Sequence, residues 1–109
     1  MITNILLIED DINLNTILAD YLRSKEYVVE TAVDGQEGWE LISKKHFDII
    51  LSDIMMPNMN GWQFLKSLRD ANNSTPLIFI SAKSDREDII KGYQLGCDDY
   101  VTKPYSMDI

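Results

Sequence analysis

Short and nearly continuous apolar runs alternate along the chain with segments in which apolar residues recur every three or four positions. A continuous run is typical of a parallel strand buried on both faces, and the longer spacing is typical of an amphipathic helix. We therefore expect an alternating series of strands and helices. The expected strands are residues 4–8, 27–32, 49–53, 77–80 and 99–103, and the expected helices centre on residues 14–22, 38–45, 62–68 and 89–93.

This strict alternation predicts one α/β domain with a doubly wound parallel sheet, right-handed crossovers and helices on both faces. Residues 27–32 are more polar than the first strand and are expected at an edge of the sheet. Asp11 is expected to cap the first helix, Asp34 and Gly35 to turn the chain before the second, and Gly96 to end the fourth. The order of the strands does not follow from periodicity.

Composition limits the classes of protein to which the chain can belong. Its 109 residues, 45% of them hydrophobic, suit one small domain with a buried core, residues 1–109. The net charge of −8 argues against binding of DNA or RNA by this segment, because an acidic surface repels phosphate. We expect no membrane span and no signal peptide. The single cysteine, Cys97, excludes an internal disulfide and suits a cytoplasmic protein.

Chemically active side chains follow the buried strands at the points where the strands are expected to end. Glu9 and Asp10 follow the first strand, Asp53 the third, Ser81 the fourth and Lys103 the fifth. Because the carboxyl ends of parallel strands share one edge of the sheet, we expect these groups to converge. A magnesium ion would relieve the repulsion between the carboxylates. Lys103 and Ser81 would suit a phosphoryl group carried by Asp53.

Each of these residues, taken singly, also fits an ordinary structural role. Asp10 can cap a helix, and Asp53 and Ser81 can stabilise turns. Lys103 can be a solvated lysine at the end of a strand. Their joint placement at one edge of the sheet favours a phosphoacceptor site over these separate explanations.

Four stretches that span nearly the whole chain occur in a specific order. They are residues 5–8 followed by Glu9, Asp10 and Asp11; residues 53–57 with Gly61; residues 81–83; and residues 96–104. In this order and at this spacing they resemble the receiver domains of two-component response regulators. Any one stretch is a weak signal, whereas the set is specific.

The resemblance implies a flavodoxin-like (CheY-like) fold with a five-stranded parallel sheet of order 2-1-3-4-5 and a cis peptide bond before Pro104. It implies that Asp53 accepts phosphate from a sensor histidine kinase. It also implies a magnesium site formed by Asp10, Asp53 and the backbone carbonyl of Met55, with Glu9 assisting through water.

The resemblance further assigns Lys103 and Ser81 to the phosphoryl oxygens, and Tyr100 to a rotamer switch that moves inward as Ser81 shifts. A half-buried strand tyrosine would explain Tyr100 equally well on general grounds. The implied activity is that of a phosphoacceptor that promotes its own phosphorylation and dephosphorylation, not that of an enzyme acting on other substrates.

Gly92, Gly96 and residues 98–100 look most like the subfamily in which a winged-helix DNA-binding domain follows the receiver. Control of transcription through a domain outside this sequence is therefore implied. Ile89 departs from that subfamily, which often has a basic residue there for a salt bridge between two receivers.

The final helix of the usual fold is expected to be missing, because the sequence stops at Ile109. Apolar side chains of the fourth and fifth strands, such as those of Ile78, Ile80 or Val101, would then lose their cover. We expect such a chain to self-associate, for example as a homodimer, or to be only marginally stable.

Three other functions are alternatives, and each fits the sequence less well. A flavodoxin-like cofactor binder would need a phosphate-cradling loop after the first strand, where Glu9, Asp10 and Asp11 would instead repel phosphate. A phosphate hydrolase with an Asp nucleophile usually has a second Asp two residues further on, and Ile12 occupies that place after Asp10. A degenerate receiver that serves only for docking would lack acceptor-site residues, all of which are present.

Overall fold

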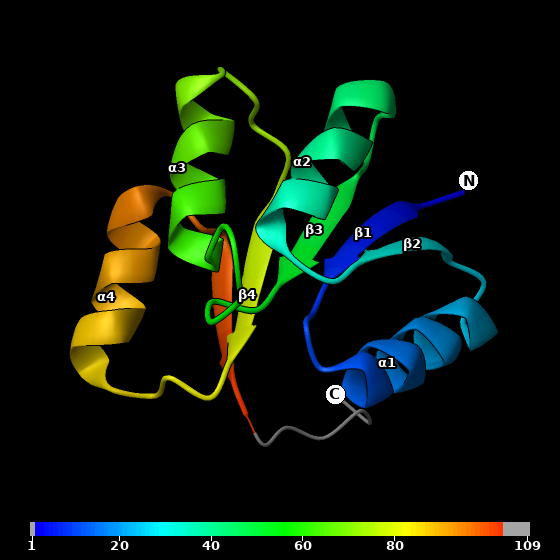
Figure 1. Ribbon diagram of the computed structural model, residues 1–109, viewed down its shortest axis with the longest axis horizontal. Helices are drawn as coiled ribbons and strands as arrows, with labels where there is room; N and C mark the ends of the chain where they lie inside the picture. The colour runs from blue at the N-terminus through cyan, green and yellow to red at the C-terminus, as the bar shows by residue number, and fades with distance from the viewer. Residues whose placement is uncertain (1, 104–109) are drawn as a thin grey trace.

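The structure is a computed structural model that describes residues 2–103, and it contains a parallel sheet with helices on both faces (Figure 1). The elements confirm the expected alternation of strand and helix. The strands are β1 (Asn4–Ile8), β2 (Val28–Ala32), β3 (Ile49–Ser52), β4 (Leu77–Ser81) and β5 (Asp99–Thr102). The helices are α1 (Ile12–Ser24), α2 (Gly35–Lys44), α3 (Gly61–Asp70) and α4 (Arg86–Leu95).

The sheet has the order β2-β1-β3-β4-β5, and every neighbouring pair of strands is parallel. This order confirms the flavodoxin-like doubly wound fold, and β2 lies at an edge as expected. Ile8 of β1 is in register with Ser52 of β3, so the residues that follow them leave the sheet side by side. In such sheets the crevice beyond the carboxyl ends, where the winding reverses, is the usual place for a site.

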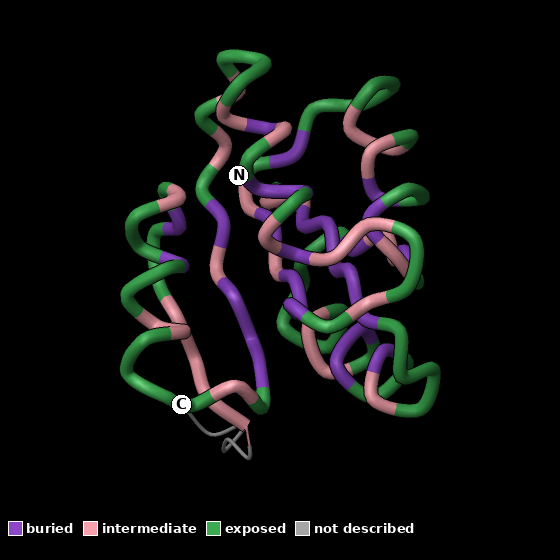
Figure 2. The backbone as a smooth tube through the Cα atoms, turned by 60° about the vertical axis from the view of Figure 1, so that its left-hand side comes forward, coloured by how far each residue is buried: buried purple, intermediate pink, exposed green. Residues whose placement is uncertain are grey.

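Alternate residues of the strands pack into two separate apolar layers. Ile5 and Leu7 of β1 pack with residues of α1, whereas Leu6 and Ile8 pack on the side covered by the other helices. Figure 2 shows that buried positions are concentrated along the strands. The buried members of the larger layer are Leu6, Ile8, Ala32, Phe47, Ile50, Ile54, Phe64, Leu65, Leu68, Leu77, Phe79 and Cys97.

Side-chain caps and one glycine explain where the helices begin and end. Asp11 caps α1 as expected, because its Oδ1 accepts a hydrogen bond of 3.1 Å from the amide of Leu14. Gly96 ends α4 with φ of 105°, a conformation that suits glycine. The chain bends at Asp34 as expected, but Gly35 already belongs to α2. Asp34 is the N-cap of α2, which begins at Gly35, three residues earlier than expected.

The apolar side chains that were expected to lose their cover lie on the face of the sheet that α1 covers in part. Ile80 is buried, and Ile78 and Val101 are half-buried. Self-association or marginal stability of the chain stays a prediction. The expected cis bond before Pro104 and the expected absence of a final helix lie outside the described residues.

Candidate functional site

The carboxylates of Glu9, Asp10 and Asp53 lie together beyond the ends of β1 and β3. Each offers an oxygen atom, and these atoms all lie within 4.8 Å of one another. Glu9 is 2% exposed and Asp53 is 9% exposed, whereas Asp10 is open to solvent. The amide of Asp53 donates a hydrogen bond of 3.0 Å to the carbonyl of Ile8. The parallel pairing of β1 with β3 therefore holds the backbone of Asp53 beside the end of β1.

Lys103, at the end of β5, reaches into this acidic cluster. Its Nζ donates hydrogen bonds of 2.7 Å to Glu9 Oε1 and 3.1 Å to Asp53 Oδ2. Burial works to lower the pKa of Lys103, but its hydrogen bonds to the two carboxylates outweigh burial and raise the pKa above its ordinary value. The ammonium group therefore stays charged beside Asp53 over the whole physiological pH range.

Glu9 is the most perturbed carboxyl group of the cluster. Burial raises its pKa from 4.5 to about 7, and the charge of Asp53 adds to this rise. The hydrogen bonds that Glu9 accepts from Lys103 and from the amide of Asp11 offset only part of it. Glu9 therefore holds a proton more tightly than an isolated carboxyl group would.

This pKa predicts a stability change with pH when a chelator excludes metal ions. Between pH 4.5 and about 7 the folded chain keeps a proton on Glu9 that the unfolded chain has already released. The free energy of unfolding should therefore fall as pH rises through this window. In Glu9→Gln this contribution should vanish, as urea titrations across the window can measure. Parallel pH profiles for the two proteins would contradict the prediction.

Ser81 and Tyr100 both contact Lys83, which follows β4. Ser81 is buried, and its Oγ accepts a hydrogen bond of 3.1 Å from the Lys83 amide. The Tyr100 hydroxyl donates a bond of 2.6 Å to the Lys83 carbonyl, and its ring lies edge-on to Phe79. The tyrosine thus takes a half-buried position here.

The loop between β3 and α3 approaches the Asp53 backbone closely. The amide of Ile54 donates a hydrogen bond of 2.7 Å to Asp53 Oδ1, which orients the carboxylate. A Cβ atom on Gly61 would collide with the Asp53 carbonyl, so only glycine fits at the start of α3. The side chain of Met55 is 58% exposed and takes no part in the acidic cluster.

Asn15 is a supporting residue that sequence reasoning missed. It is a buried polar residue of α1, and its Nδ2 donates hydrogen bonds of 3.0 Å to the Glu9 carbonyl and 3.1 Å to the Ala32 carbonyl. These bonds tie together the segments that leave β1 and β2. The available signal was a polar residue in helical register with the buried Leu18 and Ala19.

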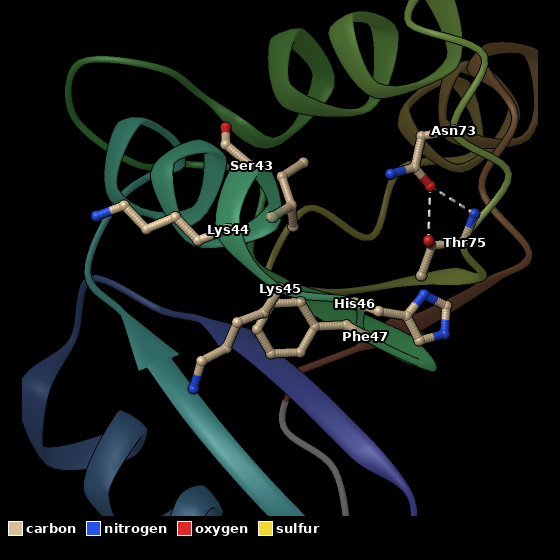
Figure 3. Close-up of a pocket in the computed structure, with 8 residues that line it drawn as sticks. Ser43, Lys44, Lys45, His46, Phe47, Asn73 and Thr75 are labelled. Atoms are coloured by element: carbon tan, nitrogen blue, oxygen red, sulfur yellow. Dashed lines mark hydrogen bonds between the residues drawn. The ribbon is translucent and has the colours of Figure 1, made fainter.

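A hollow of about 350 Å³ lies at the opposite ends of the strands from the acidic cluster, near the starts of β3 and β4 (Figure 3). Lys44 and Lys45 extend from it in different directions. Asn73 Oδ1 already accepts hydrogen bonds from the amide and the hydroxyl of Thr75. None of the residues expected to carry chemistry lines this hollow.

The chain is similar to known proteins over nearly its whole length. Residues 5–108 match the family model described as "Response regulator receiver domain". The chain is 43% identical over 104 residues to the transcriptional regulatory protein RprY of Bacteroides fragilis, covering 95% of this chain and 44% of the relative. It is 39% identical over 106 residues to the response regulator ArlR of Staphylococcus aureus, covering 97% of this chain and 48% of the relative. The chain thus spans about half the length of these curated relatives.

Solved structures of response regulators are also similar to this chain. The receiver domain of the Francisella response regulator 1452 matches with a TM-score of 0.94 and 36% identity, over 97% of this chain and 88% of that chain. The chemotaxis response regulator CheY4 of Vibrio cholerae matches with a TM-score of 0.91 and 30% identity, over 97% of this chain and 90% of that chain. Within residues 2–103, no helix combines the length and apolar character needed to cross a membrane.

The family model and the relatives together show that the chain belongs to the receiver domains of two-component response regulators.

Proposed function

We propose that Asp53 is the carboxylate of this receiver domain that accepts the phosphoryl group, and that a sensor histidine kinase is the donor. The observation that supports this role is the position of the Asp53 carboxylate. It is 9% exposed, lies 3.1 Å from the Lys103 ammonium and lies within 4.8 Å of the carboxylates of Glu9 and Asp10.

In the proposed reaction a carboxylate oxygen of Asp53 forms a bond to the phosphorus of the donor. The bond between phosphorus and the donor imidazole nitrogen breaks, and its electron pair stays on that nitrogen. Lys103 and the Ser81 hydroxyl would then hydrogen-bond to the phosphoryl oxygens. The domain acts as a phosphoacceptor that supplies its own catalytic groups, not as an enzyme with separate substrates.

The acidic cluster also fits a magnesium ion. Glu9, Asp10 and Asp53 offer the hard oxygen ligands that this ion prefers, and we assign the backbone carbonyl of Met55 as a further ligand. Glu9 would act through water, because magnesium usually keeps several waters of its own. When bound, the ion would offset negative charge on the phosphoryl oxygens.

Magnesium should stabilise the fold. At a magnesium concentration about ten times the dissociation constant, the free energy of unfolding should rise by about 1.4 kcal/mol. For a domain of this size that is a shift of several degrees in Tm, measurable in a thermal melt against a chelator control. Asp10→Asn should reduce the shift, and the matched surface variant Asp85→Asn should keep it. An unchanged Tm in the parent chain would count against the metal site.

Ser81 and Tyr100 are the proposed switch residues. A phosphoryl group on Asp53 would attract the Ser81 hydroxyl and change the space beside Tyr100. Two conformations that differ by only a few kcal/mol suffice for such a switch. The relative RprY is a transcriptional regulatory protein, so we propose that the output of the switch is control of transcription through a domain outside residues 1–109.

Incubation of the purified chain with acetyl phosphate and magnesium tests the proposed function. The intact mass should increase by one phosphoryl group, because the domain itself supplies the groups that promote transfer. Addition of a chelator in excess over magnesium should prevent the increase. A chain that gains no mass under conditions in which a known receiver domain is labelled would overturn the proposal.

A further inference from the structure

The indole ring of Trp62 lies in the first turn of α3, beneath two ammonium groups. Lys91 Nζ of α4 lies 3.9 Å from the ring centroid, and Lys83 Nζ lies 5.5 Å from it. Both distances are within the range of cation–π attraction. The indole Nε1 is buried and has no hydrogen-bond partner among the described residues, so no hydrogen bond of its own holds the ring in place. The ring instead packs against the larger apolar layer.

Lys83 joins this ring to both proposed switch residues. Its amide donates to Ser81 Oγ at 3.1 Å, its carbonyl accepts from the Tyr100 hydroxyl at 2.6 Å, and its Nζ lies over Trp62. Any movement of the backbone at Lys83 therefore acts on Ser81, Tyr100 and the cation above the indole ring together.

Helix α4 has fewer buried residues than any of the other three helices. Gly92 is the only residue of α4 that is buried, and a Cβ there would lie 3.1 Å from the Tyr100 ring and 3.3 Å from Cys97 Sγ. The neighbouring Lys91 makes the contact with Trp62. A helix held by so few buried groups can shift at low cost, so one additional contact changes its preferred position measurably.

We propose that Trp62, Lys83 and Lys91 form a cation–π bridge that couples Ser81 and Tyr100 to the position of α4. The inference rests on the proposed phosphoacceptor function and adds Trp62 and Lys91 as coupling residues. Two like charges near one ring repel each other, and the ring attracts both. A displacement of Lys83 therefore changes how strongly Trp62 holds Lys91, and with it α4.

The experiment uses beryllofluoride with magnesium as the probe and amide NMR spectra as the measurement. In the parent chain the amides of Asp53 and Met55 and those of α4, residues 86–95, should all change on addition of the probe. In Lys91→Met the changes at Asp53 and Met55 should persist. The population shift reported by α4 should change about two- to five-fold, the effect of one cation–π contact on a two-state equilibrium.

Two control variants separate the bridge from general effects of charge. Lys91→Arg keeps a cation over the ring and should respond as the parent chain does. Lys25→Met removes a comparable surface contact, in which Lys25 Nζ lies 5.6 Å from the Tyr21 ring, and should change nothing at α4. In a Trp39→Phe background Trp62 is the sole tryptophan, so its fluorescence should change with the probe and change less in Lys91→Met.

The possible outcomes distinguish this inference from the function on which it rests. An α4 response in Lys91→Met equal to that of the parent chain, with the Asp53 response intact, would overturn the bridge alone. Absence of any response at Asp53 and Met55 in the parent chain would overturn the proposed function and the bridge with it. Lys91 is exposed, so its replacement leaves the fold intact in either case.

Discussion

Replacement of Asp53 by asparagine is expected to abolish labelling of the chain by acetyl phosphate. The amide has nearly the size of the carboxylate but is not a competent nucleophile for phosphoryl transfer. Its oxygen can still accept the hydrogen bond from the amide of Ile54, so the loop after β3 should keep its position. Intact-mass spectrometry before and after incubation with the donor and magnesium measures the result.

A matched control lies at the other end of the same strand. Asp48 is exposed and accepts a hydrogen bond of 2.7 Å from the amide of Asn4, which an asparagine oxygen can also accept. Asp48→Asn should therefore be labelled as fully as the parent chain. A label that persists in Asp53→Asn would mean that another carboxylate is the acceptor, and Asp10 would be the first to examine because it lies in the same cluster.

Truncation of Phe64 to alanine should cause a large loss of stability. Phe64 is fully buried, and its ring packs edge-on against Trp39 with the ring centroids 6.1 Å apart. Loss of this burial and the cavity left behind should lower the free energy of unfolding by about 3–5 kcal/mol. That is a large share of the roughly 5–15 kcal/mol that stabilises a typical domain.

Urea titration of the two proteins measures this difference. Ile17→Ala is the matched control, because Ile17 is an apolar helix residue that is 53% exposed, and its truncation should change the free energy by only about 0.5 kcal/mol. A loss below about 1 kcal/mol for Phe64→Ala would mean that the core between α2, α3 and the sheet collapses around the missing ring.

The sequence by itself determined the fold class and most of the elements. Continuous apolar runs such as residues 5–8 and 77–80 mark buried parallel strands because a strand covered on both faces has no polar side. Alternation with helical segments then leaves few topologies. The strand ends also delivered Glu9, Asp53 and Lys103 to one edge, because parallel strands place their carboxyl ends together. Their approach to hydrogen-bond distance depends also on the strand order β2-β1-β3-β4-β5, which periodicity does not determine.

The start of α2 was less predictable than the fold class. Asp34 and Gly35 carry the composition of a turn, yet Asp34 caps α2. Its second carboxylate oxygen accepts a hydrogen bond of 2.8 Å from Asn58, which belongs to the loop after β3. A Cβ on Gly35 would also collide with the backbone of Met59. Periodicity cannot register such contacts, because the partners lie more than twenty residues apart in the sequence.

Only the tertiary structure decided which residues support the site and which couple it to α4. Asn15 and Trp62 belong to helices, where a polar residue or a tryptophan is common and says little by itself. Asn15 gains its role from carbonyls at the ends of two strands, and Trp62 gains its role from lysines on α4 and on the loop before it. Such roles arise from packing between elements, which the order of residues within any one element does not contain.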